Sequence, residues 1–171
     1  MTKQVTHLSQ SDDEAALTAL ELSLERMLHG YHRWKAACLD TVGDYRLGGD
    51  DITILNIVRM DDRPRKLGDI AGFLNRTDIS NLQYAARKLV AAGLIEKING
   101  SSRKDTMYQA TALGREVTDR YAETRRRLMV SRTAQGLSAG NVAAASELAQ
   151  ALAGLYEAAA GVARTEKFGA K

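Results

Sequence analysis

The first third of the chain carries a long apolar stripe at helical spacing. Ser11, with Glu14 three residues later, has the pattern of a capping box, and apolar residues then recur at alternating three- and four-residue steps. The sequence therefore predicts one long helix that ends at Gly48 and Gly49. Because a stripe on a helix of roughly 30 residues is longer than the core of a small domain covers, we expect part of it to meet a partner helix. Its members are Leu17, Leu20, Leu24, Met27, Tyr31, Trp34, Cys38 and Tyr45.

Three shorter helices are predicted next. Asp50 is expected to cap the first of them, which ends before the only proline, Pro64. Apolar residues at helical spacing predict a second helix over residues 67–74, and a polar turn over residues 75–77 follows it. Residues 78–92 form the third, with either Asp78 or Thr77 as its cap and Gly93 as the stop.

The helix over residues 78–92 has two distinct faces. The inward face is apolar and consists of Ile79, Leu82, Ala86, Leu89 and Val90. The outward face is polar and consists of Ser80, Asn81, Gln83, Tyr84, Arg87 and Lys88. Such a helix packs on its apolar side and offers the polar side to a partner or to water.

After this helix the apolar residues change from helical spacing to alternation, which predicts a hairpin. Residues 94–99 and 105–110 alternate apolar and polar positions, and the loop between them is rich in turn-forming and basic residues. Thr111 then opens a helix to about Thr133, and Ser138 opens an alanine-rich helix. The apolar stripe of that last helix consists of Val142, Ala145, Ala149, Leu152, Tyr156 and Ala159.

Composition agrees with a mainly α fold that has a small β-hairpin. Hydrophobic residues make up 44% of the 171 residues and charged residues 26%, which is typical of a folded globular protein. The single cysteine excludes an internal disulfide framework and fits a reducing compartment. No apolar stretch approaches the roughly 18 residues of a membrane span, and the N-terminal residues lack a signal-peptide pattern. We therefore expect a cytoplasmic protein that has no membrane partner.

The charges are unevenly distributed. Net charge is +3, yet residues 63–104 hold nine basic and three acidic residues, a net charge of +6. The remainder is therefore acidic overall. A basic centre between neutral or acidic arms is the pattern expected when one segment binds a polyanion and the rest of the protein does not.

Two short helices joined by a turn, followed at once by a hairpin with a basic loop, form a winged helix-turn-helix. The polar face of residues 78–92 would fit the major groove of DNA, with Asn81 and Gln83 as candidates for reading base edges. Arg87 and Lys88 are expected to bind phosphate or guanine. At the hairpin tip, Arg103 and Lys104 would reach the adjacent minor groove.

The segments LGDIAGFL after Pro64, ARKLVAAGLIEK and SSRKDTMYQATALGRE resemble the MarR family of winged-helix regulators. That resemblance implies a homodimeric regulator, in which residues 1–49 and 112–171 form dimerisation helices around a DNA-binding domain at 50–111. It also implies a repressor that responds to a small-molecule effector or an oxidant. The turn before the recognition helix is one residue longer than the family's. Ser102 and Lys104 stand where the family's wing carries Asp and Arg.

Several residues allow a functional and a structural interpretation. Cys38 is either an oxidant-sensing thiol or a small core residue on the apolar stripe. Tyr31, Trp34 and Tyr45 either line an effector pocket or pack in the core. Glu25, His29 and His32 share one helical face, but without a fourth ligand in view we expect a solvated face and no metal.

An enzyme is not expected, because the sequence shows no nucleophile with a plausible base and no phosphate-cradling loop. No cofactor is expected either. The main hypothesis is a transcription regulator that binds double-stranded DNA. Its rival is a winged-helix protein-interaction module that has lost DNA binding.

Overall fold

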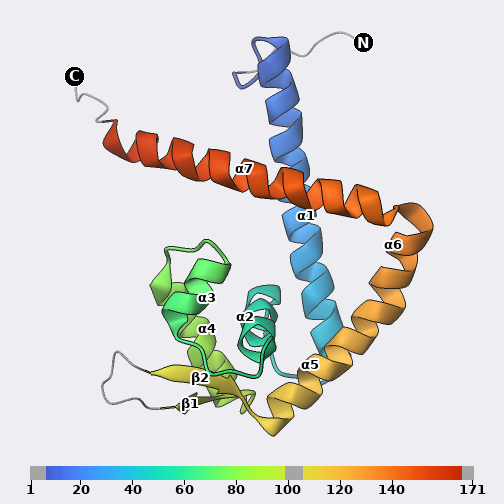
Figure 1. Ribbon diagram of the computed structural model, residues 1–171, viewed down its shortest axis with the longest axis vertical. Helices are drawn as coiled ribbons and strands as arrows, with labels where there is room; N and C mark the ends of the chain where they lie inside the picture. The colour runs from blue at the N-terminus through green and yellow to red at the C-terminus, as the bar shows by residue number, and fades with distance from the viewer. Residues whose placement is uncertain (1–6, 99–105, 167–171) are drawn as a thin grey trace. The chain divides into compact units, whose positions relative to one another are not determined.

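A computed structural model describes residues 7–98 and 106–166. Its contacts divide the chain after Thr124 into two units, so the boundary falls inside the segment predicted as C-terminal dimerisation helices. In the first unit, α1 (Asp12–Asp40), α2 (Gly49–Arg59), α3 (Leu67–Phe73) and α4 (Ile79–Ala91) precede a hairpin of β1 (Ile95–Ile98) and β2 (Met107–Ala110). Helix α5 (Ala112–Arg125) follows the hairpin (Figure 1). The mainly α fold with a β-hairpin is confirmed.

Helix α1 begins as predicted and ends early. The Ser11 hydroxyl accepts from the Glu14 backbone N–H at 3.2 Å, and the Glu14 carboxylate accepts from the Ser11 N–H at 3.3 Å. The expected continuation to Gly48 is wrong, since the helix stops at Asp40. At its end the Thr41 hydroxyl donates to the Cys38 carbonyl at 2.7 Å, which takes up a carbonyl that a further helical turn would need. Tyr45 consequently lies outside the helix.

Helix α2 forms the centre of the first unit. It packs against α1, α3, α4 and β2, and its apolar residues are buried on more than one side, as expected of a helix surrounded by its neighbours. Its N-terminal cap differs from the prediction. The Asp51 carboxylate, not that of Asp50, accepts from the Gly48 backbone N–H at 2.8 Å, while Asp50 is bound to Arg76.

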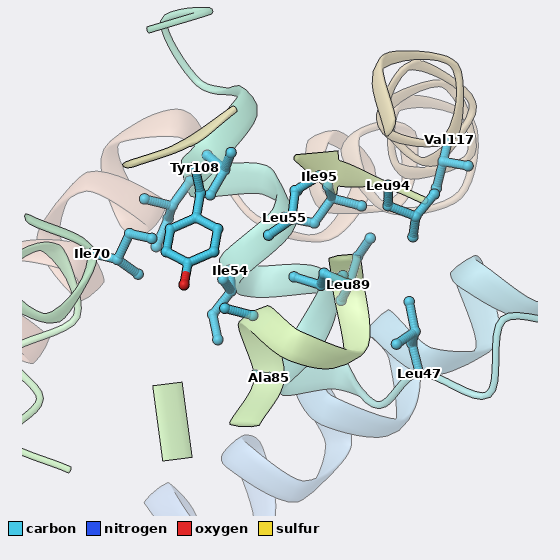
Figure 2. Packing of buried hydrophobic residues seen from close by; sticks show 14 of the residues in the cluster. Leu47, Ile54, Leu55, Ile70, Ala85, Leu89, Leu94, Ile95, Tyr108 and Val117 are labelled. Carbon is cyan, nitrogen blue, oxygen red and sulfur yellow. The ribbon is translucent and has the colours of Figure 1, made fainter. Parts of the chain in front are cut away.

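One hydrophobic cluster joins these elements. Leu55 of α2, Leu89 of α4 and Val117 of α5 are almost fully covered, as are Leu94 and Ile95 at the start of the hairpin (Figure 2). Ile79 was predicted to face this core but is 38% exposed. It occupies the first position of α4 and lines an open groove between α3, α4 and the hairpin.

Helix α4 ends as the sequence predicts. Gly93 has φ of +71°, a left-handed conformation that favours glycine. The backbone N–H of Leu94 donates to the Leu89 carbonyl and that of Gly93 to the Val90 carbonyl, which is the hydrogen-bond pattern of a Schellman motif. The chain turns sharply there and enters β1 directly.

The hairpin is antiparallel, with Ile95 opposite Ala110 and Ile98 opposite Met107. Arg65 pairs with Tyr108 on the other edge of β2 through two backbone hydrogen bonds of 2.9 and 2.8 Å. The segment before α3 therefore anchors the hairpin to the helices. The predicted hairpin tip lies outside the described residues.

The helical segment after Arg125 differs from the single helix predicted to about Thr133. It contains the π-helical segment η2 (Arg126–Val130) and then α6 (Ser131–Gly136). The Ser131 hydroxyl donates to the Arg127 carbonyl at 2.5 Å, and the Ser131 backbone N–H bonds to the Arg126 carbonyl, five residues back. The hydroxyl thus takes the acceptor that an α-helix would use and favours the wider turn.

Helix α7 (Ala139–Thr165) begins at the predicted cap, where the Ser138 hydroxyl accepts from the Asn141 N–H at 3.1 Å. None of its residues is buried. Large apolar side chains lie in solvent along it, and Leu148 and Leu155 are 58% and 67% exposed. Within the second unit, α7 therefore leaves its apolar side chains largely uncovered.

Candidate nucleic-acid interface

Helix α4 presents a polar face because its apolar residues are held in the core. Leu82, Ala86 and Leu89 are at most 1% exposed, and Ala85 is also buried. With these positions turned inward, the 3.6-residue period places Ser80, Asn81, Gln83, Tyr84 and Arg87 outward, and all five are exposed. These five residues are accessible to a ligand, as a recognition helix requires.

A groove of about 880 Å³ runs between α3, α4 and the hairpin. It is lined by Gln83 and Arg87 of α4, by Lys97 and Tyr108 of the two strands, and by the start of α3. The complete set among the described residues is Lys66, Leu67, Gly68, Asp69, Ile79, Gln83, Arg87, Lys97, Thr106 and Tyr108. Three of these side chains are basic and one is acidic, so the groove suits an anion such as a phosphodiester strand.

Arg87 and Lys97 are the cations most available in this groove. The side chain of neither forms a hydrogen bond or an ion pair with the part of the chain that the structure describes, and both residues are exposed. They approach the groove from two sides, Arg87 from the helix and Lys97 from the wing. A cation without an internal partner retains its full attraction for phosphate.

Lys88 was predicted to face outward with Arg87, but its ammonium is bound within the protein. Its Nζ atom donates to Asp51 Oδ2 at 2.5 Å, and the Asp51 side chain is only 8% exposed. The ion pair joins α4 to the N-terminal turn of α2. Its arrangement supports a structural role for Lys88 in place of a contact with DNA.

Replacing Lys88 by methionine is expected to destabilise the fold. The change leaves the buried Asp51 carboxylate with the Gly48 N–H alone, a loss of about 2 kcal/mol, discounted because Lys88 itself is partly exposed. Urea denaturation would measure it. The matched control, Lys97→Met, removes an unpaired cation and should leave the midpoint unchanged. Adding Asp51→Asn to Lys88→Met removes the unpaired buried charge and should recover part of the lost stability. Equal midpoints for Lys88→Met and Lys97→Met would contradict a structural role for Lys88.

Other cations in the basic segment are also neutralised. Arg65 pairs with Asp61, and its guanidinium lies over the Phe73 ring at 4.7 Å. These contacts hold the segment around Arg65 beside α3. Fewer cations of residues 63–104 are therefore available to a nucleic acid than the net charge of +6 suggests.

Arg76 occupies the turn before α4 and joins α2 to the N-terminal cap of α4. Its Nη1 donates to Asp50 of α2 at 2.7 Å, while Nε and Nη2 donate to the two carboxylate oxygens of Asp78 at 2.7 and 2.5 Å. The Asp78 carboxylate also accepts from the Asn81 side-chain amide at 2.9 Å. Arg76 holds the pKa of Asp78 well below its usual range, and the Asn81 amide adds to that effect.

The remaining predicted site residues lie elsewhere. The tip residues Arg103 and Lys104 are outside the described residues. Among the described residues that line the groove, none is Tyr31, Trp34 or Tyr45. Trp34 and Tyr45 are partly buried against the core cluster. Tyr31 is 53% exposed.

Tyr31 interacts with a buried lysine that the sequence did not single out. The Lys35 ammonium lies 4.2 Å from the Tyr31 ring centroid and donates to the Thr53 hydroxyl at 2.6 Å. Lys35 is 3% exposed, and burial lowers the pKa of its ammonium. The contact joins α1 to α2. Because lysine is commonly solvated, its position on the helix gave no signal of this role.

Cys38 is a core residue with 1% exposure, and burial raises the pKa of its thiol. Both properties disfavour the reactive thiolate that an oxidant sensor needs. His29 forms a 3.7 Å pair with Glu25, and within the described ranges no three histidine, cysteine or carboxylate side chains gather as metal ligands. Across the same ranges no helix combines the length and apolarity of a membrane span.

The sequence predicted α4 and its polar face, but not all of the groove beside it. Lys66 and Lys97 contributed to the charge excess over residues 63–104, yet nothing in their spacing indicated that they would lie beside Arg87. Their common location depends on how the hairpin folds back beside α3. The charge excess was the only available signal.

Comparisons with known proteins agree with this architecture. Residues 47–114 match a family described as the winged helix DNA-binding domain. No curated protein sequence matches the chain. The solved structure of a MarR variant from E. coli complexed with operator DNA is similar, with 16% identity and a TM-score of 0.67, over 83% of this chain and 99% of that one.

Two further solved structures extend the comparison. NMB1585, a MarR family regulator from Neisseria meningitidis, has 16% identity and a TM-score of 0.66, over 85% of this chain and 96% of that one. RV1404 from Mycobacterium tuberculosis has 22% identity and a TM-score of 0.53, over 89% of this chain and 97% of that one. The chain has a MarR-like winged helix-turn-helix fold.

Proposed function

We propose that this chain, with its MarR-like fold, is a transcription regulator that binds double-stranded DNA as a homodimer. The observation that carries the proposal is the basic groove between the exposed face of α4 and the hairpin. A helix with this polar face fits the major groove, and a phosphodiester strand beside it would run past Arg87 and Lys97. The E. coli MarR structure similar to this chain contains operator DNA, which supports DNA as the partner of this chain.

The salt dependence of binding tests this function. Each phosphate neutralised by a lysine or arginine releases counterions, so affinity for a random duplex should fall steeply as salt rises from low to physiological concentration. Fluorescence anisotropy on a labelled duplex would measure it. No binding, or binding without salt dependence, would exclude DNA binding and favour the protein-interaction module.

Arg87→Ala is expected to weaken binding to all duplex sequences by a similar factor. Loss of a charge-assisted hydrogen bond to phosphate should cost about 1.5–3 kcal/mol per protomer. The salt slope should also fall by about one per protomer. Arg120→Ala is the control, because Arg120 pairs with Glu116 on α5 and does not line the groove. Equal affinities for the two variants would contradict the placement of phosphate beside Arg87.

The homodimer is supported by apolar residues that the chain leaves exposed. On α1, Leu17, Leu28 and Tyr31 lie on one helical face and are 49%, 49% and 53% exposed, and α7 has no buried residue. A symmetric partner would cover such faces and place two recognition helices on one DNA site. Light scattering at micromolar concentration should give twice the chain mass of 18.6 kDa. A mass of one chain would contradict the dimer.

A further inference from the structure

The turn before α4 contains a chain of polar contacts that ends on a candidate base-reading residue. It runs from Asp50 on α2 through Arg76 to Asp78 and from there to Asn81. The first three groups satisfy one another with hydrogen bonds of 2.5 to 2.7 Å. Asn81 belongs to the exposed face of α4, so the chain of contacts links the core helix to the surface proposed to meet DNA.

The bond from Asn81 to Asp78 determines which way the amide faces. A carboxylate only accepts hydrogen bonds, so it must face the Nδ2 donor of Asn81 and not its Oδ1 acceptor. The Oδ1 atom and one N–H are then left for an external partner. An isolated surface asparagine would rotate between both orientations and would lose that freedom only on binding.

Arg76 is what keeps the Asp78 carboxylate in place. Its planar guanidinium engages both oxygens of Asp78 and simultaneously one oxygen of Asp50, a fork that lysine does not reproduce. With two carboxylates bound to it, the guanidinium carries no uncompensated positive charge for phosphate. Its contribution to DNA binding would therefore come through Asn81 and not through its own charge.

We propose that Arg76 is a positioning residue that, through Asp78, fixes the Asn81 amide with Oδ1 directed to a base bearing an exocyclic amino group in the major groove. This inference rests on the proposed function. Adenine and cytosine both offer such an amino group, whereas guanine and thymine present a carbonyl oxygen at that position. Adenine is the better match, because its N7 accepts the amide N–H that Asp78 leaves unused.

The test uses the full-length protein and begins by selecting bound sequences from a random duplex pool. Affinities are then measured for the selected site, for its single-base-pair variants and for a random duplex over a salt series. Relative to the wild-type protein, the Asn81→Ala variant should lose discrimination at one base pair in each half-site. That loss is expected to be about 5- to 150-fold, the range for one amide pairing.

Arg76→Met should remove discrimination at the same base pair and leave the random-duplex affinity and salt slope unchanged. The double variant Arg76→Met/Asn81→Ala should be no worse than Asn81→Ala alone, because both changes remove one interaction. A general weakening of the fold would instead lower affinity for every sequence and add to the Asn81 effect. Arg76→Lys keeps a cation between the carboxylates and should show the same loss if Arg76→Met fails to fold.

The outcomes separate this inference from the proposed function. If wild-type protein binds DNA with salt dependence and Arg76→Met or Arg76→Lys keeps full discrimination at the Asn81 base pair, the positioning role is wrong. A lower salt slope in Arg76→Met would also overturn it, since Arg76 would then contact phosphate directly. If the wild-type protein binds no duplex at all, the proposed function fails instead.

Discussion

Gly114→Ala is expected to lower the free energy of unfolding by about 3 kcal/mol, because a Cβ atom at this position has no space. Such an atom would lie 1.9 Å from the Leu94 carbonyl oxygen and 3.0 Å from its carbonyl carbon. The carbonyl is not free to move away. It accepts from the Thr111 backbone N–H at 3.1 Å and from the Thr111 hydroxyl at 3.2 Å.

The clash would therefore separate the first turn of α5 from the start of the hairpin. The Gly114 backbone N–H donates to the Thr111 hydroxyl at 3.0 Å, so the helix cap would be disturbed with it. Val117, one turn further along α5, is 1% exposed and would lose its packing in the core. Urea denaturation at one fixed protomer concentration would measure the change.

Gly72→Ala is the matched control for Gly114→Ala. Gly72 lies in α3, and an added Cβ there would meet nothing within 4 Å. Alanine restricts the unfolded chain and favours the helix, so this variant should be as stable as the wild type or more stable by up to about 1 kcal/mol. If both variants lost stability equally, close packing at Gly114 would not be the cause.

Leu89→Ala is expected to destabilise the protein by about 2–5 kcal/mol through lost burial and the cavity left behind. Leu89 has no exposed surface and belongs to the cluster that joins α2, α4 and β1 (Figure 2). Its carbonyl also accepts from the Leu94 N–H in the turn that ends α4. Loss of packing here would loosen the support of α4.

The control for Leu89→Ala is Gln83→Ala on the same helix. Gln83 is exposed and lines the groove, so its removal should change stability by less than about 0.5 kcal/mol. The two thermal midpoints, measured at equal protomer concentration, provide the comparison. Similar midpoints would show that the inward and outward faces of α4 have been assigned incorrectly.

Local patterns predicted most element boundaries because their causes are local. The Ser11 capping box, the Gly93 stop and the Ser138 cap depend on side chains or backbone angles within a few residues. Prediction failed where the apolar pattern continues but a local side-chain hydrogen bond ends the helix. The stripe continues past Asp40, but the Thr41 hydroxyl takes the Cys38 carbonyl and the helix ends.

For the candidate site, the sequence predicted α4 and its polar face, but not which cations on that face remain free of internal partners. Arg87 and Lys88 are neighbours in sequence and were given the same role. In the structure one lines the groove and the other is bound to Asp51, which lies 37 residues earlier in the chain. A pairing over that separation is set by how α2 packs on α4, and no local pattern records it.

The sequence alone therefore determined the order of the helices, the hairpin and the two faces of α4, since hydrophobic period and caps act over a few residues. Only the tertiary structure decided which cations remain available for an anion and which hold the fold together. It also decided that Arg76, Asp78 and Asn81 form one connected group with Asp50. Electrostatic partners are chosen by proximity in space, and packing of distant segments creates that proximity.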